Sequence, residues 1–469
     1  MFAFFLKMRI RDVTFFIALG FFIYLLAVLG SSCAQIGLPI GGPRDTIPPN
    51  LVSANPPAGT VNFKGNRITL NYDEYVLLQK LQENLLVSPT PKLNPNVDSK
   101  LRTVTIKIRD TLEPNTTYRF DLGNSIQDIN ENNAVKNFSY VFSTGPYIDS
   151  LEFSGNVQLA QTGKPDTTLL VFLYQDLDDS AVFKHKPKYI TRLNTTGNFR
   201  FHNLPGGTYR VFALKDASGQ KIYSGRDELF AFADSAVNIG DSTKPVKLFA
   251  YSQEKPTIKG AANTISADKK LKYTTSATGG KQDLLTPLTV EFNHPLKNFD
   301  SLKIELTDTL LNPYKPALVS LDSTHKKIII KYQWQDNTDY RLIIPKDFAT
   351  DTLGAALVKA DTIRFKTKKE SDYGSIKINF KNLEKFKNPV LQFVINNEVV
   401  NSFPLNASQW SIKFFNPGDY EIRILEDLNN NGVWDPGNYT LKLQPEKVYG
   451  VTQKINIRAD WENERDIIL

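Results

Sequence analysis

The sequence predicts an all-β chain built from several small β-sandwiches in series, and three observations carry that prediction. Apolar and polar residues alternate, with many β-branched and aromatic residues, in segments such as 67–72, 103–108, 327–332 and 420–425. This alternation is typical of strands with one buried face. Turn-forming clusters separate the segments, and helical periodicity is scarce, with one short helix-like window at 76–86. Many short strands without intervening helices indicate sandwiches rather than a parallel sheet.

Length and composition support several ordinary globular domains. The chain has 469 residues, of which 41% are hydrophobic and 22% charged, and such a length corresponds to about two to four domains. Cys33 is the only cysteine, so an internal disulfide, a Cys-ligated zinc site and an iron–sulfur cluster are excluded. The four histidines are too far apart in sequence for a local His-x-x-x-His metal pair.

The N-terminus has the pattern of an export signal. Lys7, Arg9 and Arg11 precede an apolar run over 13–29, and small residues at 30–32 precede Cys33. A basic start, an apolar stretch and a small-residue exit predict a secretory signal. Residues 30–33 resemble a lipobox of the relaxed kind common among Bacteroidota lipoproteins, which implies a signal peptide over 1–32, lipidation of Cys33 and a linker over 33–43. A cleaved soluble form and a retained membrane helix are the alternatives, and Met8 is a second candidate start.

Two internal repeats predict the domain order. The segment 115–120, Asn-Thr-Thr-Tyr-Arg-Phe, recurs at 337–342, and the segment 207–216 recurs at 418–427. The chain therefore divides into four units of two kinds. We expect unit A over 44–147, unit B over 148–254, unit A′ over 255–370 and unit B′ over 371–469, in the order A–B–A′–B′.

The residues of unit A resemble a known family. The opening segment 45–57, the segment 71–74 and the exit strand 140–144 look like the bacterial Ig-like domain of S-layer proteins and of many Bacteroidota lipoproteins. Unit A′ looks like a divergent second copy. Units B and B′ resemble prealbumin-like or carboxypeptidase-regulatory-like modules, chiefly through 198–209. The resemblance implies a fold and an envelope location but no reaction, because such sandwiches host many functions.

One loop of unit B′ has the spacing of a calcium site. Residues 427–438 read Asp-Leu-Asn-Asn-Asn-Gly-Val-Trp-Asp-Pro-Gly-Asn. Oxygen ligands at loop positions 1, 3, 5, 7 and 9 would come from Asp427, Asn429, Asn431, the carbonyl of Val433 and Asp435, with Gly432 allowing the tight turn. Asn438 replaces the bidentate glutamate of position 12. The alternative is a hairpin in which Asn431-Gly432 is a turn that needs no ion.

A dispersed motif predicts a modification. Asp followed by Ser or Thr and then by Ala, Ile, Leu, Val or Thr occurs more often than composition explains. The motif is similar to the O-glycosylation acceptor of Bacteroidota envelope proteins. Its acceptors would be Thr46, Thr111, Ser150, Thr167, Ser180, Ser235, Ser242, Ser301, Thr309, Ser323, Thr352 and Thr362. The alternative is that Asp-Ser and Asp-Thr simply suit turns and strand starts.

The motifs of common enzymes are missing from the sequence. It contains no Gly-x-Ser-x-Gly elbow, no Gly-x-x-x-x-Gly-Lys loop and no His-Glu-x-x-His segment. The net charge of +7 is mild, and the lysines are scattered, which disfavours nucleic acid as a partner. We expect a non-enzymatic, lipid-anchored outer-membrane scaffold that binds envelope proteins. The sequence does not decide between the periplasmic and the surface leaflet. No cofactor is expected beyond structural calcium. The alternative is a glycan-binding or nutrient-capture lipoprotein, which solvent-facing Trp334 and Trp434 would support.

Overall fold

The structure is a computed structural model that describes residues 10–30, 44–254, 270–314 and 317–469. It confirms the all-β fold class, because nearly all regular structure is strand. The α-helices among the described residues are α1 (Ile10–Gly30), α2 (Leu81–Asn84) and α3 (Ala181–Lys184). In the helix-like window 76–86 only α2 is helical, a single turn between β3 (Val76–Leu78) and β4 (Leu86–Ser88).

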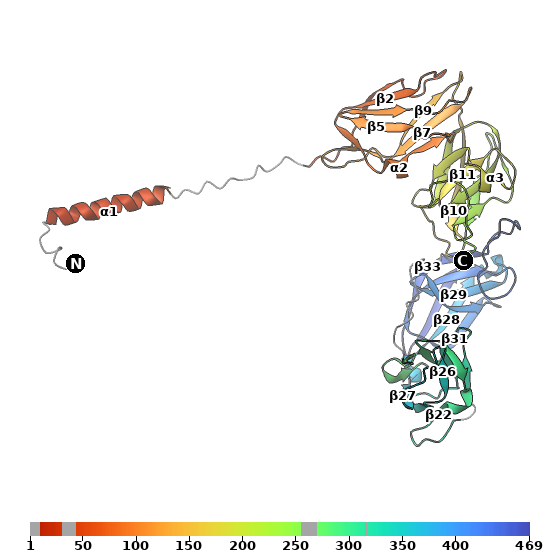
Figure 1. The fold of residues 1–469 in the computed structure, drawn as a ribbon. Coiled ribbons are helices and arrows are strands. Elements are labelled where there is room, and N and C mark those ends of the chain that lie inside the picture. Colours follow the sequence, from red (N-terminus) through yellow and green to blue (C-terminus); the bar gives the residue numbers. More distant parts are fainter. Residues whose placement is uncertain (1–9, 31–43, 255–269, 315–316) are drawn as a thin grey trace.

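Helix α1 covers most of the predicted signal segment and stands apart from the β-units (Figure 1). Among the described residues, no helix combines the length and hydropathy needed to cross a membrane. Cys33, the predicted lipidation site, lies outside the described residues.

Unit A is a sandwich of two antiparallel layers. One layer has the strand order β1-β2-β6-β5, and the other has β4-β7-β9, with β3 and β8 paired beside them. Inward side chains such as Ile68, Leu70 and Phe120 form its core. The remaining strands are β1 (Leu51–Asn55), β2 (Arg67–Tyr72), β5 (Asn96–Lys100), β6 (Thr103–Lys107), β7 (Thr117–Gly123), β8 (Ile126–Asp128) and β9 (Phe138–Ser143).

Unit A′ repeats this topology. Its orders β18-β20-β24-β23, β22-β25-β27 and β21-β26 match the three groups of unit A, and β19 adds a short parallel partner to β27. The strands are β18 (Tyr273–Thr275), β19 (Lys281–Gln282), β20 (Leu288–Phe292), β21 (Leu296–Phe299), β22 (Glu305–Thr307), β23 (Leu318–Leu321), β24 (Lys327–Lys331), β25 (Asp339–Ile344), β26 (Ala349–Asp351) and β27 (Asp361–Thr367).

Units B and B′ share a second topology. A three-stranded layer, β13-β10-β17 or β31-β28-β34, faces a layer with the order β12-β11-β14-β15 or β30-β29-β32-β33. In both units the central strand of the three-stranded layer has one parallel neighbour. The strands of unit B are β10 (Leu151–Leu159), β11 (Leu170–Tyr174), β12 (Tyr189–Arg192), β13 (Asn198–Leu204), β14 (Gly207–Leu214), β15 (Phe230–Phe232), β16 (Val237–Ile239), which pairs with β14, and β17 (Val246–Ala250).

The strands of unit B′ are β28 (Gly374–Lys381), β29 (Pro389–Ile395), β30 (Glu398–Pro404), β31 (Gln409–Phe415), β32 (Gly418–Glu426), β33 (Lys447–Ile457) and β34 (Glu462–Ile468). The alternation that marks strands in the sequence holds here too. In β28, Ile376, Ile378 and Phe380 point into the core while the residues between them are partly exposed.

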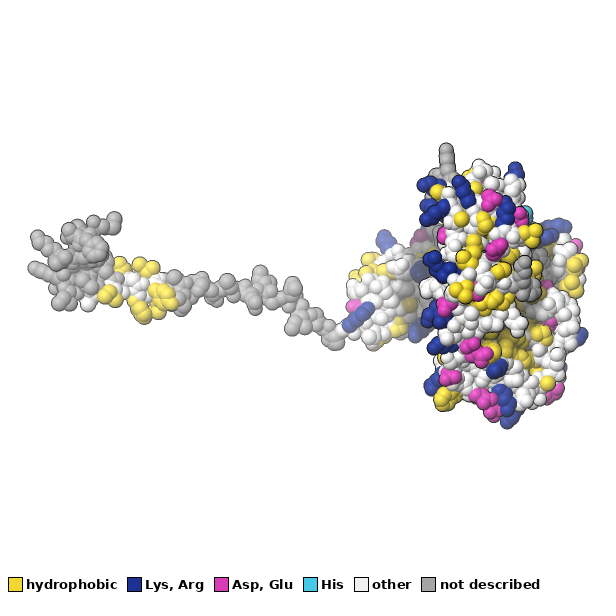
Figure 2. Space-filling model, turned by 90° about the horizontal axis from the view of Figure 1, so that it is seen from below, with side chains coloured by type: hydrophobic (Ala, Val, Ile, Leu, Met, Phe, Trp, Pro, Cys, Tyr) yellow, Lys and Arg dark blue, Asp and Glu magenta, His cyan; other side chains and the backbone are white. Residues whose placement is uncertain are grey.

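The units do not follow one another in space as they do along the chain. Figure 1 shows a row in the order A–B–B′–A′, so that the two units of the second kind meet in the middle. Seen from the unit A′ end, the surface carries Lys and Arg along one edge and apolar side chains nearer the middle (Figure 2).

Tyr439 of unit B′ forms the centre of the junction between units B and B′. Its side chain is 2% exposed and lies among unit B rings, with centroid distances of 5.5 Å to Phe212, 5.4 Å to Phe230 and 5.0 Å to Phe232. Its hydroxyl donates to the carbonyl oxygen of Asp179 at 3.1 Å. The two units therefore share one aromatic cluster, which excludes water between them.

Polar contacts surround that cluster. The Val448 amide of unit B′ donates to the Ala160 carbonyl of unit B at 3.0 Å. Lys164 pairs with Glu421 at 3.0 Å, and Lys442 pairs with Asp179 at 2.8 Å. Backbone and side-chain bonds thus fix the orientation of the two units around the apolar centre.

Candidate functional site

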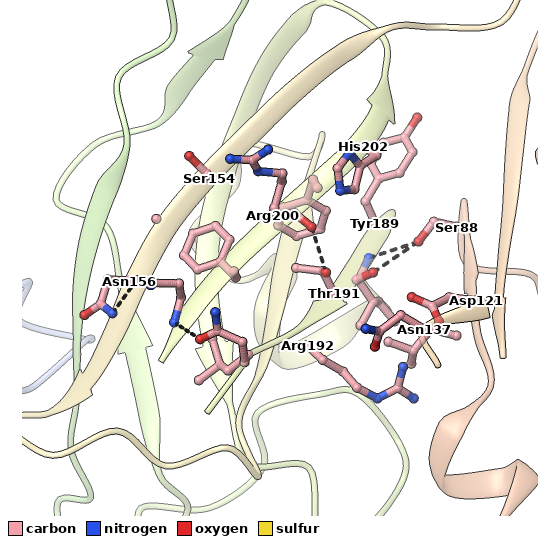
Figure 3. A pocket seen from close by; sticks show the side chains of 18 of the residues that line it. Ser88, Asp121, Asn137, Ser154, Asn156, Tyr189, Thr191, Arg192, Arg200 and His202 are labelled. Carbon is pink, nitrogen blue, oxygen red and sulfur yellow. Dashed lines mark hydrogen bonds between the residues drawn. The ribbon is translucent and has the colours of Figure 1, made fainter. Parts of the chain in front are cut away.

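A cleft of about 1190 Å³ lies between units A and B. Unit A contributes β4 and β7, and unit B contributes β10, β12, β13 and the start of β17. Figure 3 shows side chains from both units directed toward this space. The cleft is larger than the usual small-ligand pocket of about 300–1,000 Å³.

Strand alternation in unit B places polar groups on the cleft wall. In β10, Phe153 and Val157 point into the core, so Ser154 and Asn156 point outward. In β13, Phe199 and Phe201 point inward and Arg200 points outward. The register pairs Ser154 with Arg200 across the two strands. The same alternation that builds the core of unit B therefore lines the cleft with hydrogen-bonding side chains.

Two half-buried arginines form the charged part of the cleft. Arg119 lies on the outward face of β7 and Arg192 at the end of β12. Neither guanidinium is in an ion pair with a described residue, and Arg192 donates to the Glu83 carbonyl at 2.8 Å. Burial lowers the pKa of both arginines, and the nearby Asp121 carboxylate opposes that shift in each. Both remain cationic at neutral pH, so the cleft holds partly desolvated positive charge.

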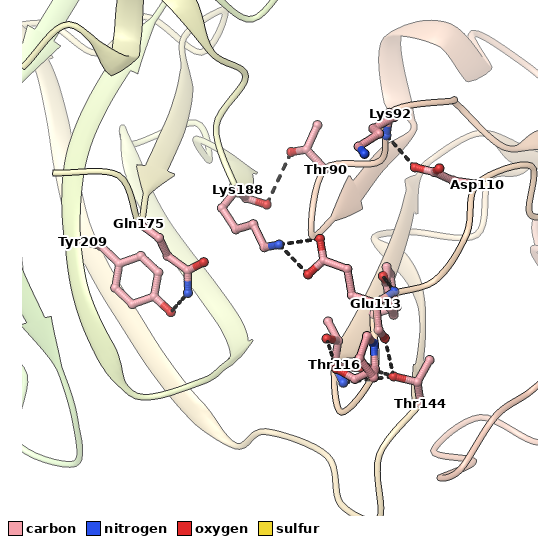
Figure 4. Close-up of polar contacts among 11 residues, drawn as sticks. Thr90, Lys92, Asp110, Glu113, Thr116, Thr144, Gln175, Lys188 and Tyr209 are labelled. Carbon is pink, nitrogen blue, oxygen red and sulfur yellow. Dashed lines mark hydrogen bonds and ion pairs between the residues drawn. The ribbon is translucent and has the colours of Figure 1, made fainter. Parts of the chain in front are cut away.

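Polar contacts at one side of the cleft hold units A and B together (Figure 4). Lys188 of unit B reaches the Glu113 carboxylate of unit A at 2.6 Å, and the Thr90 amide donates to the Lys188 carbonyl at 2.8 Å. The Ser88 hydroxyl and the backbone of Ile190 bond in both directions, at 3.2 and 3.3 Å. These contacts set the width of the cleft at its closed side.

Sequence reasoning missed this cleft. Its residues come from segments about a hundred positions apart, as in the contact of Ser88 with Ile190. The segments 115–120 and 198–209 contain Arg119 and Arg200, but neither pattern indicates that they face one cleft. The available signal was the series of polar residues at outward strand positions, but that series is equally typical of a solvated face.

The predicted calcium loop is held together by hydrogen bonds among its own residues. The buried Asp427 carboxylate accepts backbone N–H groups of Asn430, Asn431 and Gly432 at 2.6–3.2 Å. The side-chain amides of Asn429 and Asn431 donate to one oxygen of Asp435 at 2.6 and 2.7 Å.

The structure therefore links the four predicted side chains, Asp427, Asn429, Asn431 and Asp435, by hydrogen bonds within this loop. Val433, predicted to contribute its carbonyl, donates its amide to the Asn431 side chain at 2.8 Å.

Glu446 is a further acidic residue of this loop that the sequence pattern missed. Its two carboxylate oxygens accept the amides of Leu428 at 2.7 Å and Asp435 at 3.0 Å. Burial raises the pKa of Glu446, and the neighbouring Asp427 and Asp435 carboxylates add to that rise. In the described part of the chain, no three His, Cys, Asp or Glu side chains are placed as metal ligands. Calcium binding at this loop stays a prediction.

The twelve predicted glycosylation acceptors all lie among the described residues. Ser180, Ser301 and Thr362 are partly buried, and the other nine are exposed. The alternative role of the preceding aspartates in turns also has support. The Asp45, Asp300 and Asp351 carboxylates, among others, accept the backbone N–H two residues on. The structure thus leaves nine of the twelve acceptor residues exposed, and the modification stays a prediction.

Trp334 and Trp434 do not offer the sugar-stacking surface that the glycan alternative needed. Trp334 is 9% exposed and donates to the Thr286 carbonyl at 3.0 Å. Trp434 is half-buried and donates to the Glu446 carbonyl at 2.8 Å. Trp410 packs against Phe403 in the core of unit B′, whereas Trp461 is 62% exposed. Stacking on Trp334 or Trp434 therefore no longer supports glycan binding.

A family of known proteins matches part of the chain. Residues 45–144 match the bacterial Ig-like domain family, which agrees with the resemblance of unit A and with its two-layer topology. No curated protein matches the chain.

Solved structures resemble the chain at low similarity. They include native alpha-2-macroglobulin of Escherichia coli (12% identity, 39% of this chain and 72% of that one, TM-score 0.19). The major pilin subunit BcpA of Bacillus cereus follows at 10% identity, 68% and 99% coverage and TM-score 0.17. The N-terminal part of the bacterial S-layer protein SbsC has 14% identity, 45% coverage of both chains and TM-score 0.16. Similarity at this level carries no argument about function.

Proposed function

We propose that this chain is a non-enzymatic scaffold of a bacterial outer membrane, anchored by lipid on Cys33, with the β-units serving as spacers and docking surfaces. The bacterial Ig-like match over 45–144 supports a structural rather than a catalytic use of the N-terminal unit. The arrangement of the four units in a row is the main support for this proposal, because a spacer must keep its two ends far apart.

The bonded junctions give the row its stiffness. Units A and B are joined by the Lys188–Glu113 ion pair and by backbone bonds, and units B and B′ by the Tyr439 cluster. Units A′ and B′ are joined by the bond from the Leu284 amide to the Tyr373 hydroxyl at 2.7 Å. The apolar interface around Tyr439 restricts the domain motion that is otherwise the default between neighbouring domains, whereas the polar contacts at the other two junctions orient their units.

Unit A′, at the end of the row, offers a surface for protein partners. Its exposed side chains include Leu302 at 89%, Leu310 at 80% and Leu318 at 61%. Exposed apolar side chains on a polar surface are typical of protein interaction sites, and Figure 2 shows apolar side chains on the face viewed from this end. We expect envelope proteins to bind there.

Lipid labelling tests the anchor. Cells that make the full chain should incorporate a palmitate analogue into it, and Cys33→Ala should abolish both the label and fractionation with membranes. Ser32→Ala, which keeps the thiol, is the matched control and should keep both. A Cys33→Ala chain that still fractionates with membranes would contradict the anchor. Protease treatment of intact cells then decides the leaflet, because only a surface-exposed chain is cut.

The predicted glycosylation also belongs to this proposal, since nine of the twelve acceptor residues are exposed. Intact-mass measurement of the protein from its native host should show added hexose-type mass. Loss of that mass in Ser235→Ala or Ser242→Ala, two exposed positions of unit B, would locate the sugar. An unmodified mass would contradict the modification.

A further inference from the structure

We propose that the cleft between units A and B binds an anionic saccharide, one that carries carboxylate or sulfate groups on a polyhydroxylated ring. This ligand-binding role goes beyond the scaffold function and does not depend on the lipid anchor. The charge, the neutral hydrogen-bonding groups and the contrast with unit B′ each contribute to it.

The cleft has an excess of positive charge. Four cationic side chains and one carboxylate line it, a formal excess of three charges with histidine neutral: Arg119, Arg192, Arg200 and Lys247 against Asp121. Arg200 already has a partner, Glu152 at 3.5 Å, so the available charge is concentrated at Arg119 and Arg192.

Arg119 and Arg192 suit an incoming anion. Each is half-buried and has no ion-pair partner among the described residues, and the two share the influence of Asp121. Two guanidinium groups beside one carboxylate leave one net positive charge that water solvates only partly. Because planar guanidinium groups bind carboxylate and sulfate oxygens in a bidentate manner, an acidic group placed here would form charge-assisted hydrogen bonds.

Neutral polar side chains line much of the rest of the cleft. They include Asn84, Ser88, Asn137, Ser154, Gln158 and Thr191, which suit the many hydroxyl groups of a sugar.

The three-stranded layer of unit B′ has the same outward face, and there the charged side chains pair with one another. The strand registers place Lys377 where unit B has Ser154, and Asp466 where unit B has Lys247. In unit B′ the face is closed by its own contacts, since Lys377 pairs with Glu464 at 2.9 Å and Asn379 donates to Asp466 at 3.0 Å. Unit B lacks the acidic residues on its third strand, so its positive charge is left for another molecule.

Calorimetric titration of the full chain in detergent tests the proposal with four probes. These are trigalacturonate, a sulfated heparin-derived hexasaccharide, neutral maltotriose and inorganic phosphate. We expect one of the two acidic saccharides to bind at least tenfold more tightly than maltotriose and phosphate. Whichever one binds identifies carboxylate or sulfate as the recognised group.

Variants locate the binding. Arg119→Ala and Arg192→Ala should each weaken it tenfold or more. Arg341→Ala should leave it unchanged, because Arg341 holds the position of Arg119 in the repeat but does not line the cleft. Circular dichroism of each variant checks folding, and Arg192→Lys provides a conservative second variant with intermediate affinity.

Three results would overturn the proposal. The first is no binding of either acidic saccharide, and the second is equal binding of maltotriose or phosphate. The third is an equal loss of affinity in Arg341→Ala and Arg119→Ala.

Discussion

The two junctions that flank unit B differ in kind. Toward unit B′, the aromatic ring of Tyr439 fills the space between the units, and polar contacts surround it. Toward unit A, the contacts are polar and lie to one side, and a cleft of about 1190 Å³ opens beside them. One junction excludes water, whereas the other keeps a polar space that a molecule from outside can enter.

The comparison indicates that unit B uses one surface for a structural contact and another for binding. Burying an aromatic side chain such as Tyr439 stabilises a junction by several kcal/mol, whereas an exposed ion pair such as Lys188–Glu113 contributes little. We infer that the B–B′ junction is structural and that the A–B junction remains free for binding.

The largest expected effect concerns the aromatic junction. Tyr439→Ala should destabilise the contact of units B and B′ by about 3–5 kcal/mol, because it leaves a cavity among Phe212, Phe230 and Phe232. Urea denaturation followed by tryptophan fluorescence would show an earlier transition. Tyr439→Phe, which loses only the bond to Asp179, should cost about 1 kcal/mol. Equal losses in the two variants would show that the ring does not join the units.

A smaller effect concerns calcium at the loop that carries Tyr439. With a dissociation constant of about 1 mM, 5 mM calcium should stabilise the chain by about 1 kcal/mol over chelator, because the ion binds only the folded loop. Differential scanning calorimetry measures the shift in Tm.

Asp435→Asn is the matched variant for calcium and should abolish the shift. It removes one charge, whereas Asp427 also holds three backbone N–H groups and its loss would disturb the loop itself. The same Tm in calcium and in chelator would return the loop to an ion-free turn.

The smallest effect concerns the ion pairs of the two junctions. Lys188→Ala at the A–B junction and Lys164→Ala at the B–B′ junction should each cost less than about 1 kcal/mol, because both pairs are partly solvated. Denaturation midpoints close to that of the unchanged chain are the expected result. A loss above about 2 kcal/mol in Lys188→Ala would show that the A–B junction is held more firmly than its contacts indicate.

The sequence predicted the fold class well because strand alternation is a local property. Segments such as β2 and β24 carry their buried face in their own residue order, so the inward positions Ile68 and Ile328 were readable without any partner. The repeats also made the likeness of unit A to unit A′, and of unit B to unit B′, visible, and their sheet orders agree.

Strand alternation and repeats do not predict which units contact one another. An outward polar residue such as Arg119 or Arg192 reads as solvated surface whether water or another unit faces it. Glu446 escaped for a related reason, since it joins the Asp427 loop from beyond the twelve-residue spacing that defines the motif. The tryptophans illustrate the opposite error, because Trp334 and Trp434 lie in polar segments yet are buried or half-buried by contacts that sequence does not show.

The row order A–B–B′–A′ has a consequence for how the chain reaches its final state. Tyr439 meets Asp179 at a separation of 260 positions, so unit B completes its aromatic cluster only after unit A′ and much of unit B′ have been made. Until then, Phe212, Phe230 and Phe232 lack their cover, and such surfaces attract other chains. A ribosome or a translocation channel delivers residues in order. The apolar surface of unit B therefore stays exposed until the segment that carries Tyr439 emerges.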